Sequence, residues 1–175
     1  MKVMIVVTHL LGTGHLSRAL VLARAFDAAG HRALVVSGGM PAAQLSTQDV
    51  DIAQLPALRS DGVDFTRLLD ETGATASQTL MAERQKALLR SFETFAPDAL
   101  ITELFPFGRR VLASEFLSLL DAARAKPSLI CASVRDILAP PSKASKAART
   151  HDLIERFYDA VLVHADPQIT PLDAS

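Results

Sequence analysis

Cysteine is nearly absent from this 175-residue chain, since Cys131 is its single cysteine. One cysteine excludes a disulfide within the chain and a metal cluster held by several cysteines, and it fits a reducing, cytoplasmic setting. An excess of charge of one sign is also absent, because 18 basic residues stand against 19 acidic ones. The chain therefore has no global field that would favour nucleic acid or an anionic membrane as its partner.

Long apolar runs are missing as well. No stretch approaches the roughly 20 apolar residues that a membrane-spanning helix needs. The first apolar run is interrupted by Gly12 and His15, too early for a signal peptide. We therefore expect a soluble, cytoplasmic domain, for which contact with a membrane surface stays open.

Three nucleotide-binding or hydrolase motifs are absent. The chain contains neither a GxxxxGK[ST] phosphate loop nor a GxSxG nucleophile turn. Ser17 occupies the place of the third glycine of GxGxxG, and the predicted second strand ends in Ser37-Gly38-Gly39 without an acidic ribose ligand. His9 and His15 form the one close histidine pair, with no third zinc ligand nearby. We therefore expect neither an NAD cofactor nor a bound metal.

Hydrophobic residues make up 49% of the chain, which suits one globular domain with a substantial core. Apolar runs of strand length alternate with segments of helical spacing. The predicted strands are Lys2 to Thr8, Ala33 to Ser37, Asp51 to Leu55, Ala99 to Thr102, Leu129 to Ser133 and Ala160 to His164. This alternation predicts a Rossmann-like, doubly wound α/β domain, with a mainly parallel sheet and helices on both faces. The last helix is expected over Lys143 to Tyr158, whereas residues 56–77 show no clear period and read as a binding loop or an unassigned segment.

Ligands of doubly wound sheets sit beyond the carboxyl ends of the strands. After the first strand, Gly12, Thr13 and Gly14 form a turn into a helix, where glycines permit close backbone approach and free amides attract an anion. The same turn is also ordinary α/β scaffolding. His15 follows it as a candidate general base, and Arg18 lies nearly on the same helix face.

Other candidates lie after later strands. Glu103 can orient a hydroxyl or act only as a favourable charge before a helix, and Arg109 can clamp an anion or face water. Arg135 and Asp136 follow the fifth strand, where they favour a cleft role over a solvated pair. Two further groups are weaker: the basic helix face of Lys143, Lys146 and Arg149, and the strand-end residues His164 and Asp166.

Three segments carry a family resemblance. GTGHLSRALVLARAFDAAGH (12–31) resembles the opening of GT-B glycosyltransferases related to the lipid II-forming N-acetylglucosaminyltransferase of family 28. TELFPFGRR (102–110) and VRDIL (134–138) resemble a bacterial group of predicted glycosyltransferases in the same superfamily. The resemblance spans nearly the whole chain. The turn LLGTGH is poorer in glycine than that of the lipid II enzyme, so a lipid diphosphate acceptor does not follow.

The resemblance implies that residues 1–175 form the N-terminal, acceptor-side domain, and that a C-terminal domain, which would bind the nucleotide-sugar donor, is not in this chain. It implies a metal-independent hexosyltransferase-like reaction, in which His15 acts as base or contacts the diphosphate and Gly12 to Gly14 face the cleft. We expect this domain to be inactive alone. Two alternatives stay open: a nucleotide-sugar hydrolase or epimerase of the same fold, and a noncatalytic ligand-binding domain.

Overall fold

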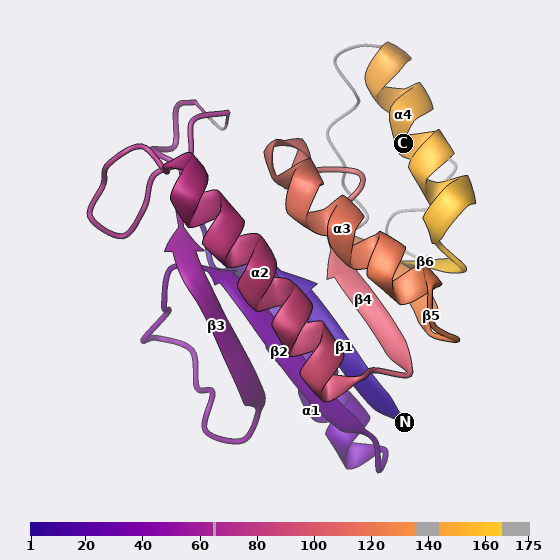
Figure 1. Cartoon of the computed structure of the whole chain (residues 1–175). Helices are drawn as coiled ribbons and strands as arrows, with labels where there is room; N and C mark the ends of the chain where they lie inside the picture. Colours follow the sequence, from indigo (N-terminus) through magenta and orange to yellow (C-terminus); the bar gives the residue numbers. More distant parts are fainter. Residues whose placement is uncertain (65, 136–143, 166–175) are drawn as a thin grey trace.

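A six-stranded, fully parallel sheet organises the chain (Figure 1). The structure is a computed structural model that describes residues 1–64, 66–135 and 144–165. The strands are β1 (Lys2–Val7), β2 (Arg32–Gly39), β3 (Asp51–Leu58), β4 (Ala99–Glu103), β5 (Leu129–Arg135) and β6 (Ala160–His164). The helices are α1 (Gly14–Ala28), α2 (Gln78–Phe95), the short η1 (Arg110–Leu112), α3 (Ala113–Arg124) and α4 (Ala144–Phe157). All six predicted strands are confirmed, and β2, β3, β4 and β5 extend beyond the predicted ends.

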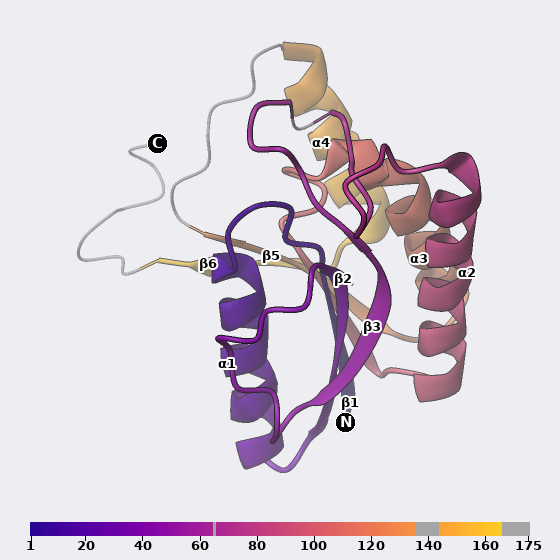
Figure 2. The ribbon, with the colours of Figure 1, turned by 90° about the vertical axis from the view of Figure 1, so that its left-hand side faces the viewer.

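Helices cover both faces of the sheet, as the alternating pattern predicts. Figure 2 shows α1 on one side and α2, α3 and α4 on the other. Successive strand side chains point to opposite faces, so β1 serves two cores. Val3, Ile5 and Val7 pack with the α1 side, whereas Met4 and Val6 pack with the α2 and α3 side. Burial on both faces explains why the central strands are continuous apolar runs.

The strand order is β3-β2-β1-β4-β5-β6. The chain thus winds outward from β1 to β3, returns to the middle, and winds the other way from β4 to β6. Crossovers from β1 and β4 leave in opposite directions, which opens a crevice at the carboxyl ends of these two neighbouring strands. The segments after β1 and β4 therefore meet at this switch point.

The unassigned segment 56–77 is now partly explained. β3 continues to Leu58, and isolated bridges then join Arg59 to Leu69 and Leu69 to Thr75. Ser77 accepts a hydrogen bond from the Leu80 amide at 3.1 Å and so caps the start of α2. Residue 65 lies outside the described residues. The segment is a loop held by short antiparallel contacts, which lack the length that sequence periodicity needs.

The C-terminal part of the sheet is its less buried side. The helix predicted over Lys143 to Tyr158 is α4, which the structure describes from Ala144 to Phe157. β6 forms one edge of the sheet and pairs only with β5 among the described strands. No helix among the described residues combines the length and apolar character required to cross a membrane.

Candidate functional site

The turn between β1 and α1 is open to its surroundings. Neither Gly12 nor Gly14 has a positive φ, and a Cβ at either position would meet no other atom within 4 Å. The backbone itself therefore does not require glycine here. The first turn of α1 has no acidic residue and no side-chain cap. Amides at the uncapped start of a helix lack intrahelical partners, and such amides are where an anion binds.

Glu103 lies at the end of β4 and is almost completely buried. One carboxylate oxygen, Oε1, binds two side chains of α1: His15 Nδ1 at 2.9 Å and Arg18 Nη1 at 2.7 Å. The three residues come from the segments that meet at the switch point of the sheet. The structure thus brings Glu103 together with His15 and Arg18, which the sequence had placed on one helix face.

This contact fixes the proton on the His15 ring. An ionised carboxylate only accepts hydrogen bonds, so Nδ1 of His15 must carry a hydrogen and donate it. In the neutral ring, the lone pair then lies on Nε2. The His15 side chain is 24% exposed, against 1% for Glu103. The arrangement is a partly exposed basic nitrogen oriented by a buried carboxylate, as found in acid–base catalysis.

The hydrogen-bond network continues across the sheet to β5 and β6. The hydroxyl of Ser133 on β5 donates to Glu103 Oε2 at 2.5 Å. His164 Nε2 on β6 lies 2.9 Å from the same hydroxyl oxygen. Sequence reasoning noted His164 as a strand-end residue and missed Ser133, which sits inside an apolar strand. Its position directly opposite Glu103 in the parallel β4–β5 pair was the available signal.

Arg109 also lies near this end of the sheet. It is half-buried and in the left-handed region, with a φ of 56°, and its Nε donates to the carbonyl of Thr8 at 2.6 Å. Burial lowers the pKa of the Arg109 guanidinium, an effect that the negative charge of Glu103 partly offsets. Arg109 thus joins the segment after β4 to the end of β1, whereas Arg110 is exposed.

His9 differs from His15 in being closed in. Its Nε2 donates to the Met40 carbonyl at 2.9 Å, and its buried Nδ1 has no hydrogen-bond partner. Burial lowers the pKa of His9, and the carbonyl of Met40 raises it to a smaller extent. His9 is therefore neutral and inaccessible. The two close histidines bond to different groups, so the pair does not act as one site.

Of the remaining predicted residues, the structure describes some and not others. Arg135 ends β5 with an exposed side chain. Asp136, Lys143 and Asp166 lie outside the described residues. Lys146 and Arg149 are exposed on the first half of α4.

A second buried ion pair lies on the other face of the sheet. Arg84 of α2 donates to Glu115 of α3 at 3.0 and 3.2 Å, with side chains that are 0% and 2% exposed. Its Nη1 also donates to the carbonyls of Gly38 and Pro56. Every nitrogen of this guanidinium is thus bonded within the protein. Sequence reasoning missed the pair, because two charges in separate helices give no sign of burial.

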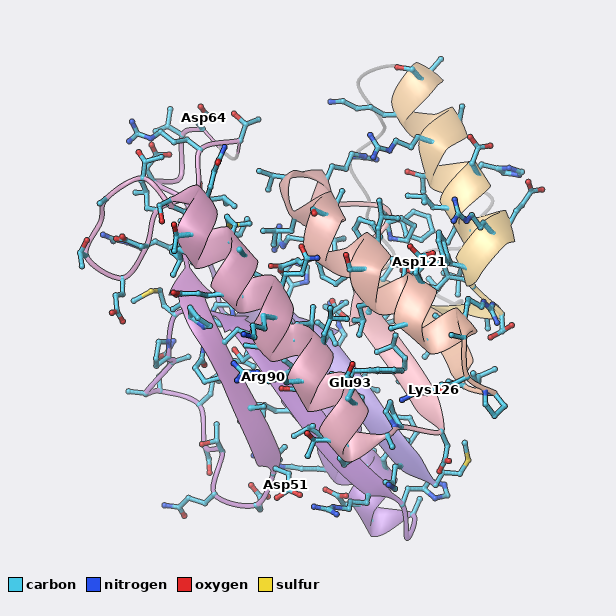
Figure 3. All side chains as sticks on the ribbon, viewed as in Figure 1. Asp51, Asp64, Arg90, Glu93, Asp121 and Lys126 are labelled. Atoms are coloured by element: carbon cyan, nitrogen blue, oxygen red, sulfur yellow. The ribbon has the colours of Figure 1, made fainter. Side chains whose placement is uncertain are left out.

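A hollow of about 700 Å³ lies at the opposite end of the sheet, between α2 and the starts of β2 and β3. Figure 3 shows two of its lining residues, Arg90 on α2 and Asp51 on β3. Other cations there already have partners: Lys2 donates to the Phe95 carbonyl at 2.9 Å, and Arg32 lies 3.4 Å from Asp51. The hollow is at the amino ends of the strands, so we place the candidate site at the switch point instead.

Comparison with solved structures identifies the fold. The glycosyltransferase SsfS6 of Streptomyces sp. SF2575 matches 98% of this chain at 16% identity and a TM-score of 0.58. MurG of Acinetobacter baumannii matches 94% at 18% identity and a TM-score of 0.55. UGT2 of Phytolacca americana, in its apo form, matches 97% at 14% identity and a TM-score of 0.61. These proteins are GT-B glycosyltransferases, and the chain has the α/β Rossmann-like fold that they share.

The match covers only part of each of these proteins. The chain spans 52% of SsfS6, 41% of MurG and 47% of UGT2. A second structure of SsfS6, in complex with thymidine diphosphate, matches 95% of this chain at 16% identity and a TM-score of 0.55, and 49% of that protein is covered. No family model matches the chain, and no curated protein does.

Proposed function

We propose that this chain is the acceptor-side domain of a two-domain glycosyltransferase, which moves a sugar from a nucleotide-sugar donor to an acceptor hydroxyl. Two facts support the division of labour: the chain has the Rossmann-like fold found in GT-B glycosyltransferases, and it spans about half the length of the proteins it matches. In this proposal the partner domain binds the nucleotide-sugar donor, and the complex of SsfS6 with thymidine diphosphate supports a nucleotide ligand for a protein of this fold. This domain alone is then inactive.

The observation that carries the proposal is the His15–Glu103 pair. His15 Nδ1 donates to Glu103 Oε1, which leaves Nε2 as the basic atom on a side chain that solvent reaches. In the proposed reaction, Nε2 takes the proton of an acceptor hydroxyl while the hydroxyl oxygen attacks the anomeric carbon. The bond from that carbon to the nucleoside diphosphate breaks, and the diphosphate leaves with the electron pair. Glu103 stabilises the positive charge that His15 acquires.

The neighbouring groups have supporting roles in this proposal. The uncapped start of α1 and the open turn of Gly12, Thr13 and Gly14 offer amide donors to the negative charge that develops on the leaving group. Arg18 adds a second positive group beside His15, with a side chain that is 23% exposed. The reaction as proposed uses no metal and no cofactor. Arg109 and Arg135 are proposed to contact substrate at the rim of the cleft.

The size of the native protein tests the two-domain part of the proposal. An antibody raised against this chain, whose mass is 18.8 kDa, is expected to detect a species of about twice that mass in source-cell extract. A native species near the mass of this chain would overturn the single-chain, two-domain arrangement and would favour a noncatalytic binding domain or a separate donor subunit.

Turnover tests the catalytic part. We expect the full-length protein to release nucleoside diphosphate from one member of a panel of nucleotide sugars when a suitable acceptor is present. His15→Gln should lower this turnover by about 10²- to 10⁴-fold, the contribution of a general base. The matched control is His31→Gln, at the far end of α1 on a histidine that packs against Phe26. Unchanged turnover in His15→Gln would exclude the base role.

The same assay separates transfer from hydrolysis. His15 could equally deprotonate water, which would give a nucleotide-sugar hydrolase of the same fold. Release of nucleoside diphosphate at the same rate with and without acceptor would identify the hydrolase. Release that requires the acceptor would identify the transferase.

A further inference from the structure

Ser133 connects Glu103 to a second histidine on the edge strand. Its hydroxyl is fully buried and lies 2.5 Å from Glu103 Oε2 and 2.9 Å from His164 Nε2. The sheet places these groups in a row, because Glu103 is the register partner of Ser133, and the ring of His164 reaches back from two positions further along β6. All three belong to the side of the sheet that α1 covers.

The hydrogens of this row can be assigned in only one way. A serine hydroxyl has a single hydrogen, and the Glu103 carboxylate can only accept. Ser133 therefore donates its hydrogen to Glu103 Oε2. The contact between Ser133 and His164 then requires a hydrogen on His164 Nε2. The row runs from His164 Nε2–H through Ser133 Oγ–H to Glu103, whose other oxygen accepts from His15 Nδ1–H and from Arg18.

The surroundings keep His164 uncharged. Burial lowers the pKa of His164, the positive charge of Arg18 lowers it further, and the negative charge of Glu103 acts in the opposite direction. At neutral pH the ring is therefore a neutral donor with one hydrogen. Each histidine is held in a different tautomer: Nδ1–H for His15 and Nε2–H for His164.

We infer that Ser133 and His164 are positioning residues for His15, which act by holding the Glu103 carboxylate in one orientation. With Oε2 bound to Ser133, the carboxylate cannot rotate without breaking a buried hydrogen bond, so Oε1 stays directed at His15 Nδ1 and Arg18. Loss of the Ser133 hydroxyl frees the carboxylate. His15 then loses the preference for the tautomer that leaves Nε2 unprotonated. The catalytic importance of this arrangement rests on the proposed function, whereas the arrangement itself does not.

The experiment determines the tautomers of the histidine rings by long-range ¹H–¹⁵N NMR on this 175-residue chain at neutral pH, without substrate. In the unaltered chain, we expect His15 as Nδ1–H and His164 as Nε2–H. Ser133→Ala should convert His15 to a mixture of both tautomers. The matched control is Ser128→Ala, which removes another buried serine hydroxyl of the β5 region, bonded to the Pro97 carbonyl at 2.9 Å. This control should leave His15 unchanged.

Two variants of the half-exposed His164 keep the test decisive if Ser133→Ala fails to fold. His164→Gln retains an N–H group at the place of Nε2, so it should preserve the Nδ1–H tautomer of His15. His164→Leu removes the donor that holds the Ser133 oxygen, so the hydroxyl can turn away from Glu103 Oε2 and His15 should give a mixture. A His15 ring that stays purely Nδ1–H in both Ser133→Ala and His164→Leu would overturn the inference. Because no turnover is measured, that outcome is separate from a failure of His15→Gln to lower activity, which would overturn the proposed function alone.

Discussion

Two buried carboxylates of this protein each bind a guanidinium, on opposite faces of the sheet. Glu115 binds Arg84 on the α2 and α3 side, and Glu103 binds Arg18 on the α1 side. The first pair is closed, since both side chains are almost fully buried and every nitrogen of Arg84 is bonded to the protein. The second is open, because it includes a histidine that solvent reaches.

The difference shows how a buried ion pair that only joins elements of the fold is distinguished from one that can bind a ligand. A closed pair satisfies all of its own groups, so it can fasten elements together but has no atom left to offer a ligand. Arg84 fastens α2 to α3 and to the carbonyls of Gly38 and Pro56. The open pair, taken together with His15, is a cluster of three residues: Glu103 is buried, whereas His15 and Arg18 are partly exposed. Nε2 of His15 has no hydrogen-bond partner among the described residues. That unbonded atom, rather than the ion pair itself, makes the cluster a candidate site.

The largest effect is expected when the closed pair of Arg84 and Glu115 is broken. Arg84→Met leaves the Glu115 charge buried without a partner, which should lower the free energy of unfolding by about 3–5 kcal/mol. Urea denaturation of the chain measures this. The double variant Arg84→Met with Glu115→Leu should recover part of the loss, because no unpaired charge remains. A cost below about 1 kcal/mol for Arg84→Met would mean that the pair behaves as a surface contact.

The next effect concerns the open pair. Glu103→Gln keeps the side-chain shape but removes the charge that supports protonated His15, so we expect turnover of the full-length enzyme to fall by about 10²-fold or more. The cost in unfolding free energy should be smaller than for Arg84→Met, about 1.5–3 kcal/mol, the value of a hydrogen bond to a charged group. A large loss of stability with unchanged turnover would make Glu103 a structural residue like Glu115.

Substitutions of two glycines, Gly38 beside the closed pair and Gly14 beside the open pair, extend the comparison. A Cβ at Gly38 would lie 2.3 Å from Thr8 Oγ1 and 2.7 Å from Arg84 Nη2, both in buried side chains, so Gly38→Ala should cost about 1–3 kcal/mol. Gly14→Ala, beside the open pair, meets nothing within 4 Å and should be neutral or slightly stabilising in urea denaturation. Equal costs for the two variants would contradict the assignment of one closed and one open region.

The smallest expected effect is a pH dependence of the free energy of unfolding, which comes from the buried His9. Burial lowers the pKa of His9 below its usual 6.5, so the folded state binds fewer protons there than the unfolded state. Its contribution to stability is complete above pH 6.5 and is lost as the pH falls through the lowered pKa. The free energy of unfolding should therefore decline from pH 7 toward pH 5, and His9→Gln should make that decline shallower. The control His151→Gln, on an exposed residue of α4, should leave the slope unchanged.

The sheet and its helices could be predicted from sequence because each element carries its own period. The apolar runs of β1 and β4 and the helical spacing in α1 are local signals, and the rule for strand ends then led to His15, Arg18 and Glu103. The contact of His15 and Arg18 with one oxygen of Glu103 was not predictable, since it depends on strand order. The roles of Ser133 and Arg84 were hidden for a related reason: a buried polar residue inside an apolar pattern shows its partner only in three dimensions.

The separation along the chain between the partners of the open pair has a consequence for folding. His15 and Glu103 are 88 residues apart in sequence, and Arg18 and Glu103 are 85 apart. Closing so long a loop carries an entropic cost that local contacts do not, and long-range parallel pairing forms slowly. In a nascent chain, His15 and Arg18 are thus made long before the Glu103 carboxylate that orients the His15 ring. We expect the oriented histidine to appear only once β4 has docked beside β1, so its tautomer reports late folding of the domain.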